Sequence, residues 1–194
     1  MAPVRSLCVY CGSSNLVAAK FLDAAFAFGR LIGQARLGLV YGGGRAGLMG
    51  RVADGVLAEG GPVTGIIPEH LHLSEIAHDG LSELLVVASM HERKQRMAER
   101  ADAFVILPGG FGTLDEMFEI ITWRQLGLHD KPIVLVDLDL YWQPLERLLD
   151  HLAAEGFNPG ADRRLYQRVE RVDEVLPALA AALPPKHPLA ARRL

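Results

Sequence analysis

Short runs of Val, Ile and Leu alternate with longer amphipathic stretches along almost the whole chain. A parallel strand needs a crossover, usually a helix, before the next strand begins, so this alternation is typical of a doubly wound α/β sheet. The predicted strands are Val4–Tyr10, Leu37–Tyr41, Pro62–Ile67, Glu83–Ala88, Ala103–Leu107 and Pro132–Asp137, with a weaker seventh at Tyr166–Val172. The predicted helices are Leu16–Arg36, Leu48–Gly60, Met90–Arg100, Leu114–Leu126 and Tyr141–Glu155.

Two apolar runs, Leu84–Val87 and Phe104–Leu107, contain no polar residues. Strands covered on both faces have this pattern, which favours a mostly parallel sheet of about seven strands with helices on both faces. The chain has 194 residues, 50% of them hydrophobic, and we expect a single domain over residues 1–183. Prolines at 184, 185 and 188 interrupt the helical pattern, so residues 184–194 are expected to form a flexible tail.

Composition narrows the classes of function. A net charge of −3 argues against a general nucleic-acid binder, and two cysteines are too few for a disulfide scaffold. No apolar run approaches the roughly 18 residues that a membrane helix needs, and the apolar stretch at the N-terminus is too brief for a signal peptide. We therefore expect a cytoplasmic protein that binds neither membranes nor nucleic acid.

Glycines cluster directly after predicted strands. The segment Pro108–Thr113 carries three glycines between a buried strand and a helix. Backbone N–H groups there can point at an anion, and the helix N-terminus adds partial positive charge, so the segment favours a phosphate site over an empty turn.

The segment Gly42–Gly47 reads as G-x-G-x-x-G, a dinucleotide-binding pattern. It follows the second strand instead of the first, and Glu69 comes later than the acid expected about 20 residues on, which disfavours NAD. The segment instead predicts a second turn that faces the ligand. No G-x-x-x-x-G-K-[ST] motif occurs, which excludes a P-loop ATPase.

Charged residues at two predicted helix N-termini allow both a structural and a functional interpretation. Thr113 and Glu116 have capping-box spacing, yet a carboxylate beside a bound sugar phosphate can also serve glycosidic chemistry, and spacing alone leaves the two readings equal. Ser89 and Glu92 repeat the capping spacing. The adjacent Arg93 and Lys94 belong either to a solvated basic face or to an anion site.

Metal sites are disfavoured. Cys8 and Cys11 would point to opposite faces of a strand and read as small buried residues. The polar segment from Glu69 to Asp79 is expected to be a loop that contacts substrate or an interface, because it lacks a helical His pair.

Four segments together resemble the Lonely Guy (LOG) family of cytokinin riboside 5'-monophosphate phosphoribohydrolases, long described as lysine decarboxylases. They are Gly42–Gly50, Met90–Lys94, Pro108–Glu116 and Ile121–Gly127, in order and at the family's spacing. The resemblance covers about residues 4–182. It implies a Rossmann-like α/β fold, usually a homodimer with composite active sites near the interface.

The resemblance also implies roles for particular residues. Arg93 and Glu116 would be the catalytic pair. The residues implied to hold phosphate and sugar are Lys94, Gly109, Gly110, Gly112 and Thr113. Met90 would pack against the base, and Glu75 and Thr122 would be further contacts. The predicted substrate-binding set is completed by Ser14, Gly43 and Asp115; family members often carry Glu at the last position.

The resulting hypothesis is hydrolysis of the N-glycosidic bond of cytokinin riboside 5'-monophosphates, AMP or both. A nucleoside 5'-monophosphate would be the small-molecule partner, and free base and ribose 5-phosphate the products. No metal or cofactor is expected. The alternative is a non-hydrolytic carrier of a nucleotide or of molybdenum cofactor, which would need no Arg93–Glu116 pair.

Overall fold

The computed structural model describes residues 4–72, 77–157 and 165–182. Their strands form one seven-stranded sheet in which all adjacent strands are parallel, which confirms the predicted sheet. The order across the sheet is β4-β3-β2-β1-β5-β6-β7. The strands are β1 (Ser6–Tyr10), β2 (Gly38–Tyr41), β3 (Val63–Pro68), β4 (Glu83–Val87), β5 (Ala103–Ile106), β6 (Ile133–Val136) and β7 (Gln167–Val169).

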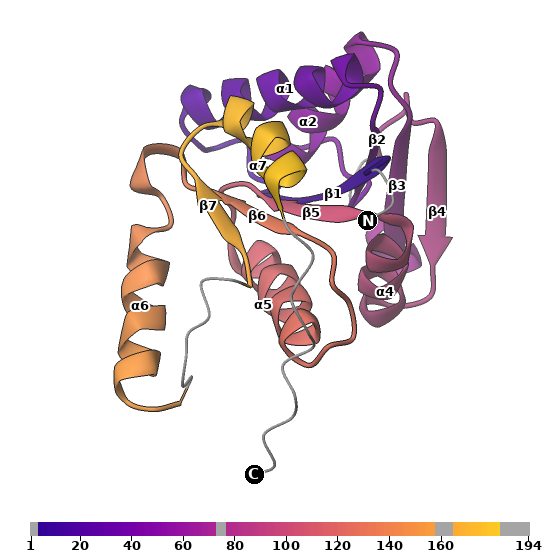
Figure 1. Cartoon of the computed structure of the whole chain (residues 1–194). Coiled ribbons are helices and arrows are strands. Elements are labelled where there is room, and N and C mark those ends of the chain that lie inside the picture. Colours follow the sequence, from indigo (N-terminus) through magenta and orange to yellow (C-terminus); the bar gives the residue numbers. More distant parts are fainter. Residues whose placement is uncertain (1–3, 73–76, 158–164, 183–194) are drawn as a thin grey trace.

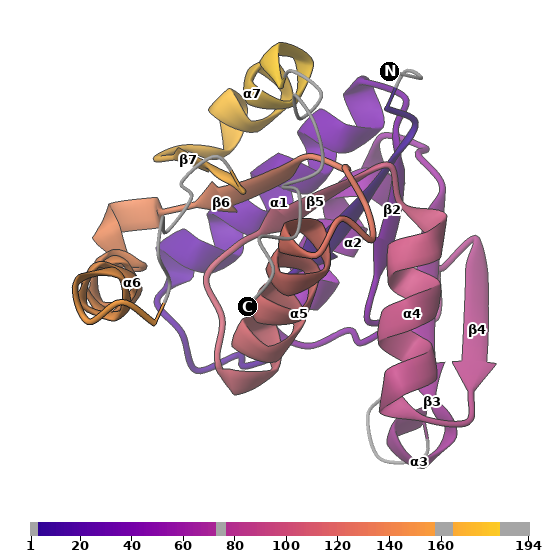
Figure 2. The same ribbon diagram turned by 60° about the horizontal axis from the view of Figure 1, so that its bottom comes forward.

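Helices cover both faces of this sheet (Figures 1 and 2). The α-helices are α1 (Ala19–Gln34), α2 (Gly47–Ala58), α3 (Glu69–His72), α4 (Met90–Arg100), α5 (Phe111–Gln125), α6 (Gln143–Ala154) and α7 (Val175–Ala181). Short 3-10 turns lie at Leu138–Leu140 and Val172–Glu174. Alternate β1 side chains separate two cores: Leu7 and Val9 pack with α1, α2 and α7, whereas Cys8 and Tyr10 pack with α4, α5 and α6. This division makes the fold doubly wound, as predicted.

Two helix starts differ from the prediction. Helix α1 begins at Ala19 instead of Leu16, whose side chain is 97% exposed and so has no packing to hold it in the helix. Helix α5 begins at Phe111 instead of Leu114, with Gly110 as its N-cap. Thr113 and Glu116 therefore lie inside α5, and the capping-box reading of this pair is wrong.

Other segments also depart from the sequence reading. Glu69–His72 forms the short helix α3 instead of a loop, and α7 was not predicted. Leu84–Val87 was expected to be covered on both faces, but β4 is the outer strand of the sheet and Val86 is 50% exposed. Cys8 and Cys11 are free and buried, as expected.

The chain reverses its winding direction at β1. It runs outward through β2, β3 and β4, then returns to place β5 on the other side of β1. The segments that follow these two central strands are joined by a hydrogen bond of 3.0 Å from the Gly12 N–H to the Pro108 carbonyl. Ligands of open α/β sheets bind at such a switch point, outside the carboxyl ends of the strands.

No helix in the described part of the chain is long and apolar enough to cross a membrane. Residues 183–194, which include the predicted tail, and the candidate contact Glu75 lie outside the described residues.

Candidate active site

A cleft of about 520 Å³ opens at the switch point between β1 and β5. Its size lies within the usual range of small-molecule sites. Its walls come from the segments after β1 and β5, the first turns of α1, α2 and α4, the first two turns of α5, and one residue after β6. The lining residues are Cys11, Gly12, Ser13, Ser14, Val17, Phe21, Leu48, Met49, Met90, Arg93, Pro108, Gly109, Gly110, Phe111, Gly112, Thr113, Asp115, Glu116 and Tyr141.

Most of the predicted site residues meet in this cleft. The predicted residues that line it are Ser14, Met90, Arg93, Gly109, Gly110, Gly112, Thr113, Asp115 and Glu116. Among the described residues, three candidates do not line it. They are Gly43, Lys94 and Thr122.

The glycine turn after β5 leads into α5. Gly110 is the N-cap of α5, and a β-carbon added at Gly110 or Gly112 would meet no atom within 4 Å. The backbone of the turn is therefore open on its cleft side. A β-carbon at Gly109 would collide with the Thr113 side chain and crowd the Gly12 amide. The turn thus combines close backbone packing with an unobstructed helix N-terminus, the arrangement that binds phosphate.

Arg93 is buried at the floor of the cleft, with 8% of its surface exposed. Its Nε donates to the Ile66 carbonyl at 3.1 Å and its Nη2 to the Gly42 carbonyl at 3.2 Å. These bonds to the ends of β3 and β2 fix the guanidinium group. The third nitrogen, Nη1, lies 3.9 Å from Oε1 of Glu116. The solvated-face reading is therefore wrong for Arg93.

Glu116 is 9% exposed and faces Arg93. Burial raises the pKa of Glu116 to about 7, although the nearby Arg93 charge acts in the opposite direction. The separation of 3.9 Å exceeds a hydrogen bond, so the carboxylate is only partly neutralised. A carboxyl group that titrates near neutral pH beside a fixed cation is typical of a catalytic site.

Lys94 is buried beside the cleft and is already paired. Its Nζ lies 3.0 Å from Asp115 and 3.2 Å from Glu119. Burial opposes the charged form, but hydrogen bonds to these two carboxylates outweigh it and raise the pKa of Lys94. Lys94 therefore acts on the cleft through Asp115, which lines it.

No residue of the Gly42–Gly47 turn lines the cleft, so the predicted second ligand-facing turn is wrong; Gly42 holds Arg93, and Gly43 and Gly47 serve packing. Gly43 has φ +80° and packs against Ile67 and Leu84. Gly47, with φ +60°, lies against the backbone of Ser13 and Ser14. Its N–H donates to Asn15 at 2.7 Å, which ties this turn to the segment after β1.

The predicted site residues did not include the three aromatic residues of the cleft, Phe21, Phe111 and Tyr141. The Tyr141 hydroxyl donates to the Gly109 carbonyl at 2.7 Å, and its ring meets Phe21 edge-on. Tyr141 was read as the first residue of a helix. Its place just after a buried strand, at the same sheet edge as the glycine turns, was the signal that could have identified it.

Helix α4 begins as its capping spacing predicts, because the Glu92 N–H donates to Ser89 Oγ at 3.1 Å. In the polar segment near α3, His78 contacts Asp54 at 2.9 Å and Asp79 contacts Arg45 at 3.3 Å. Within residues 4–72, 77–157 and 165–182, no group of three His, Cys, Asp or Glu side chains could hold a metal ion.

The chain is similar to several known proteins. A family model described as "Possible lysine decarboxylase" matches residues 49–179. A cytokinin riboside 5'-monophosphate phosphoribohydrolase from Rhodococcoides fascians is 46% identical over 182 residues, which cover 93% of this chain and 90% of that protein. One from Arabidopsis thaliana is 42% identical over 180 residues, covering 93% of this chain and 79% of that protein.

Solved structures show the same fold at lower identity. The molybdenum cofactor binding protein from Rippkaea orientalis has a TM-score of 0.71 and 18% identity, over 93% of this chain and 98% of that one. The Moco carrier protein from Chlamydomonas reinhardtii has a TM-score of 0.70 and 20% identity, over 93% of this chain and 100% of that one. At these identities the likeness concerns the fold alone.

Proposed function

The chain belongs to the Lonely Guy (LOG) family of cytokinin riboside 5'-monophosphate phosphoribohydrolases, and we propose that it hydrolyses the N-glycosidic bond of these nucleotides, releasing free base and ribose 5-phosphate. The observation that carries the proposal is the meeting of Arg93 and Glu116 in one cleft with an open helix N-terminus. Such a cleft offers an anion site and a partly neutralised carboxylate to the same ligand. The proposal extends to AMP as a second substrate, hydrolysed at the same kind of bond.

The phosphate would bind at the glycine turn. The N-terminus of α5 supplies backbone N–H groups and partial positive charge. Thr113 and Ser14 line the same cleft and offer hydroxyl groups to the phosphate or the ribose. The apolar part of the lining, which includes Val17, Leu48 and Met90, would receive the base.

The reaction would break the bond between ribose C1' and the base nitrogen. Glu116, as a carboxylate, would stabilise positive charge at C1' and orient a water molecule. The water oxygen bonds to C1', one of its protons is released, and the departing base takes up a proton. Arg93 is fixed by two backbone carbonyls and would position the substrate and assist departure of the base.

A non-hydrolytic carrier is less well supported. The carrier proteins share the fold at 18–20% identity, whereas named phosphoribohydrolases share 42–46% of residues. A carrier would also need no paired Arg93 and Glu116, which meet in this cleft.

The proposed assembly is a homodimer with active sites near the interface. Phe111, Asp115, Phe118 and Thr122 follow each other at helical spacing along α5, and all four are exposed. Phe111 is 93% exposed and lines the cleft, so a partner covering this face would lie against the cleft. Thr122, which does not line the cleft of its own chain, would then lie at the interface.

Light scattering tests the dimer. The wild-type protein is expected to have twice the chain's mass, and Phe118→Glu to reduce it to one chain. Val86→Glu, on the outer strand β4, is the matched control and should leave the dimer intact. Dissociation by the control alone would place the interface elsewhere.

The activity is tested by incubating purified protein with AMP and, separately, with isopentenyladenosine monophosphate, followed by chromatography. Free base should appear from at least one nucleotide, and Glu116→Gln should lower its rate by at least about 100-fold. Intact nucleotides with the folded wild-type protein, or full activity of the variant, would contradict the proposal. The ratio of the two rates identifies the preferred base.

A further inference from the structure

The connection between β6 and α6, residues 137–142, has an unusual backbone. Asp139 and Leu140 have φ values of 51° and 59°, in the left-handed region that favours glycine. The Leu140 side chain is 51% exposed, so burial of that side chain does not explain the conformation. Backbone of this kind persists only where its surroundings hold it, and it clusters at functional sites.

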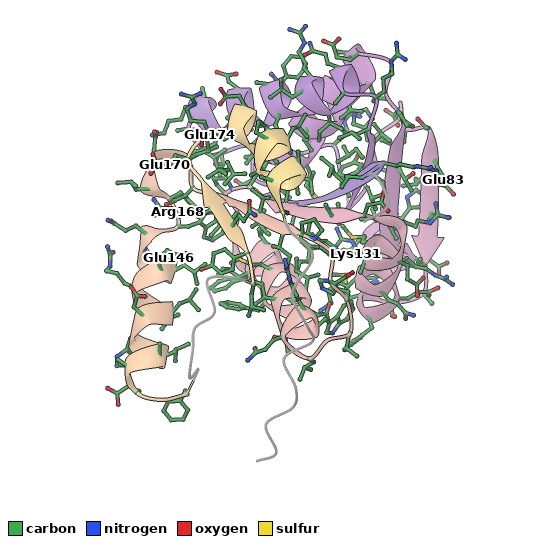
Figure 3. All side chains as sticks on the ribbon, viewed as in Figure 1. Glu83, Lys131, Glu146, Arg168, Glu170 and Glu174 are labelled. Carbon is green, nitrogen blue, oxygen red and sulfur yellow. The ribbon has the colours of Figure 1, made fainter. Side chains whose placement is uncertain are left out.

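Two ion pairs hold the connection. Asp137 is buried, accepts the Trp142 N–H at 2.6 Å through Oδ1, and faces the Arg168 Nε at 2.9 Å through Oδ2. Asp139 pairs with Lys20 of α1 at 2.5 Å. Figure 3 shows Arg168 on β7, the strand next to β6. The connection is therefore anchored both to the sheet and to the first turn of α1.

The anchored backbone places Tyr141 in the cleft. Its ring contacts Phe21 edge-on with centroids 5.7 Å apart, and Trp142 edge-on at 4.8 Å. Its hydroxyl donates to the Gly109 carbonyl at 2.7 Å. The residue thus reaches across from the end of β6 to the glycine turn at the end of β5.

The accepted hydrogen bond fixes one peptide group of that turn. The peptide between Gly109 and Gly110 is planar and trans, so holding its carbonyl also fixes its N–H in the opposite direction. Glycine rotates about its backbone more freely than any other residue, so this peptide needs an outside contact to hold it. A flipped peptide would present a carbonyl oxygen in place of an N–H, and a carbonyl oxygen repels a phosphate.

We propose that Tyr141 is a positioning residue that holds the Gly109–Gly110 peptide in the orientation that binds the phosphate of the substrate. This proposal rests on the proposed function, because it assumes that the glycine turn receives the phosphate. Tyr141 acts through the turn, so its hydroxyl should affect binding of the phosphate end and leave the base and the chemical step unaffected.

The test compares Tyr141→Phe with Tyr166→Phe. The second variant removes another tyrosine hydroxyl bond, the 2.7 Å contact to Glu146 of α6, at a site outside the cleft lining; Figure 3 shows Glu146. Tyr141→Phe should raise the KM for AMP and the inhibition constant of ribose 5-phosphate roughly tenfold, the upper range for one neutral hydrogen bond. The kcat and the inhibition constant of adenine should change less than about threefold. Tyr166→Phe should change none of these values by more than that.

Unchanged ribose 5-phosphate inhibition in Tyr141→Phe would overturn the proposal, as would equal effects of the two variants or equal losses for adenine and ribose 5-phosphate. Calorimetric titration with ribose 5-phosphate repeats the comparison without turnover. If the wild-type protein binds ribose 5-phosphate but hydrolyses no nucleotide, the proposed function fails. Ribose 5-phosphate binding by Tyr141→Phe and Tyr166→Phe then still tests the positioning role of Tyr141. If the folded wild-type protein does not bind it, the positioning role is overturned.

Discussion

The guanidinium group of Arg93 occupies the space in which a β-carbon of residue 42 would lie. The two residues are also joined by a hydrogen bond of 3.2 Å from Nη2 of Arg93 to the Gly42 carbonyl. Residue 42 must therefore be glycine, because any larger residue would collide with the Arg93 side chain. The glycine-rich turn after β2 thus contributes to the site by admitting Arg93.

Gly42→Ala should displace Arg93 from its two carbonyl acceptors and lower kcat/KM by about 100-fold or more, because small misplacement of a catalytic group is costly. The matched control is Gly38→Ala, at the opposite end of the same strand, where a new β-carbon would meet its nearest atom at 3.7 Å. Steady-state kinetics on both variants measure the effect. Wild-type kinetics in Gly42→Ala would contradict the assigned packing.

Glu116→Gln should become more stable than the wild-type protein as pH rises. The pKa of Glu116 is raised from 4.5 to about 7, so the folded state disfavours its ionised form. Its contribution to stability is complete below pH 4.5 and is lost as pH rises through about 7. At 1.36 kcal/mol per pKa unit, the variant should gain up to roughly 3 kcal/mol on the wild type between pH 4.5 and 8. Urea unfolding at both pH values measures this gain, and a constant difference would contradict the raised pKa.

Asp115→Asn should shift the pH profile of the enzyme toward acid. The proposed mechanism needs Glu116 as a carboxylate, so kcat/KM should rise with pH and level off above about 7. The negative charge of Asp115 raises the pKa of Glu116, and its removal lowers that pKa. The acid limb of kcat/KM should therefore move to lower pH.

Lys94→Gln should shift the same limb toward higher pH, because the positive charge of Lys94 lowers the pKa of Glu116. The two substitutions change adjacent charges with opposite sign and thus control for each other. Shifts in the same direction would show that something other than Glu116 titrates.

Arg168→Met should destabilise the fold by roughly 2–4 kcal/mol, since it leaves the buried Asp137 carboxylate without its cation. Adding Asp137→Asn should recover part of this loss because an amide carries no charge to bury. The control is Arg171→Met, which breaks a solvent-exposed pair with Asp173 and should change the stability much less than Arg168→Met does, because water screens exposed pairs. Equal losses in denaturant titrations of the two single variants would contradict this reading.

The strands and the parallel sheet could be predicted from the sequence, because strands buried on both faces consist of consecutive apolar residues. Helix α7 was not predicted, and it carries Pro177. Proline is tolerated there because it falls in the first turn of the helix. The prediction that Leu84–Val87 is covered on both faces was wrong, because an apolar run does not reveal that its strand lies at the edge of the sheet, where Val86 is exposed.

The site was predictable only in part. For Glu116, the helix-cap and catalytic interpretations were equally good, and for Arg93 a solvated surface charge remained open; family resemblance pointed to the catalytic role of both. Spacing could not decide because the helix start depends on Gly110, whose capping uses backbone geometry and no side-chain hydrogen bond. Tyr141 was not found because its contact with Gly109 joins residues 32 positions apart, and its placement depends on a backbone conformation unusual for Asp139 and Leu140.

The hydrogen bond between Gly12 and Pro108 joins two segments that are separated by four strands and four helices along the chain. During synthesis, β1 emerges first and has only β2 as a neighbour until β5 arrives. Until then the hydrophobic edge of β1 stays open and neither the glycine turn nor Glu116 exists. The cleft therefore cannot form until the segments on both sides of this hydrogen bond, and α5 with Glu116, are present.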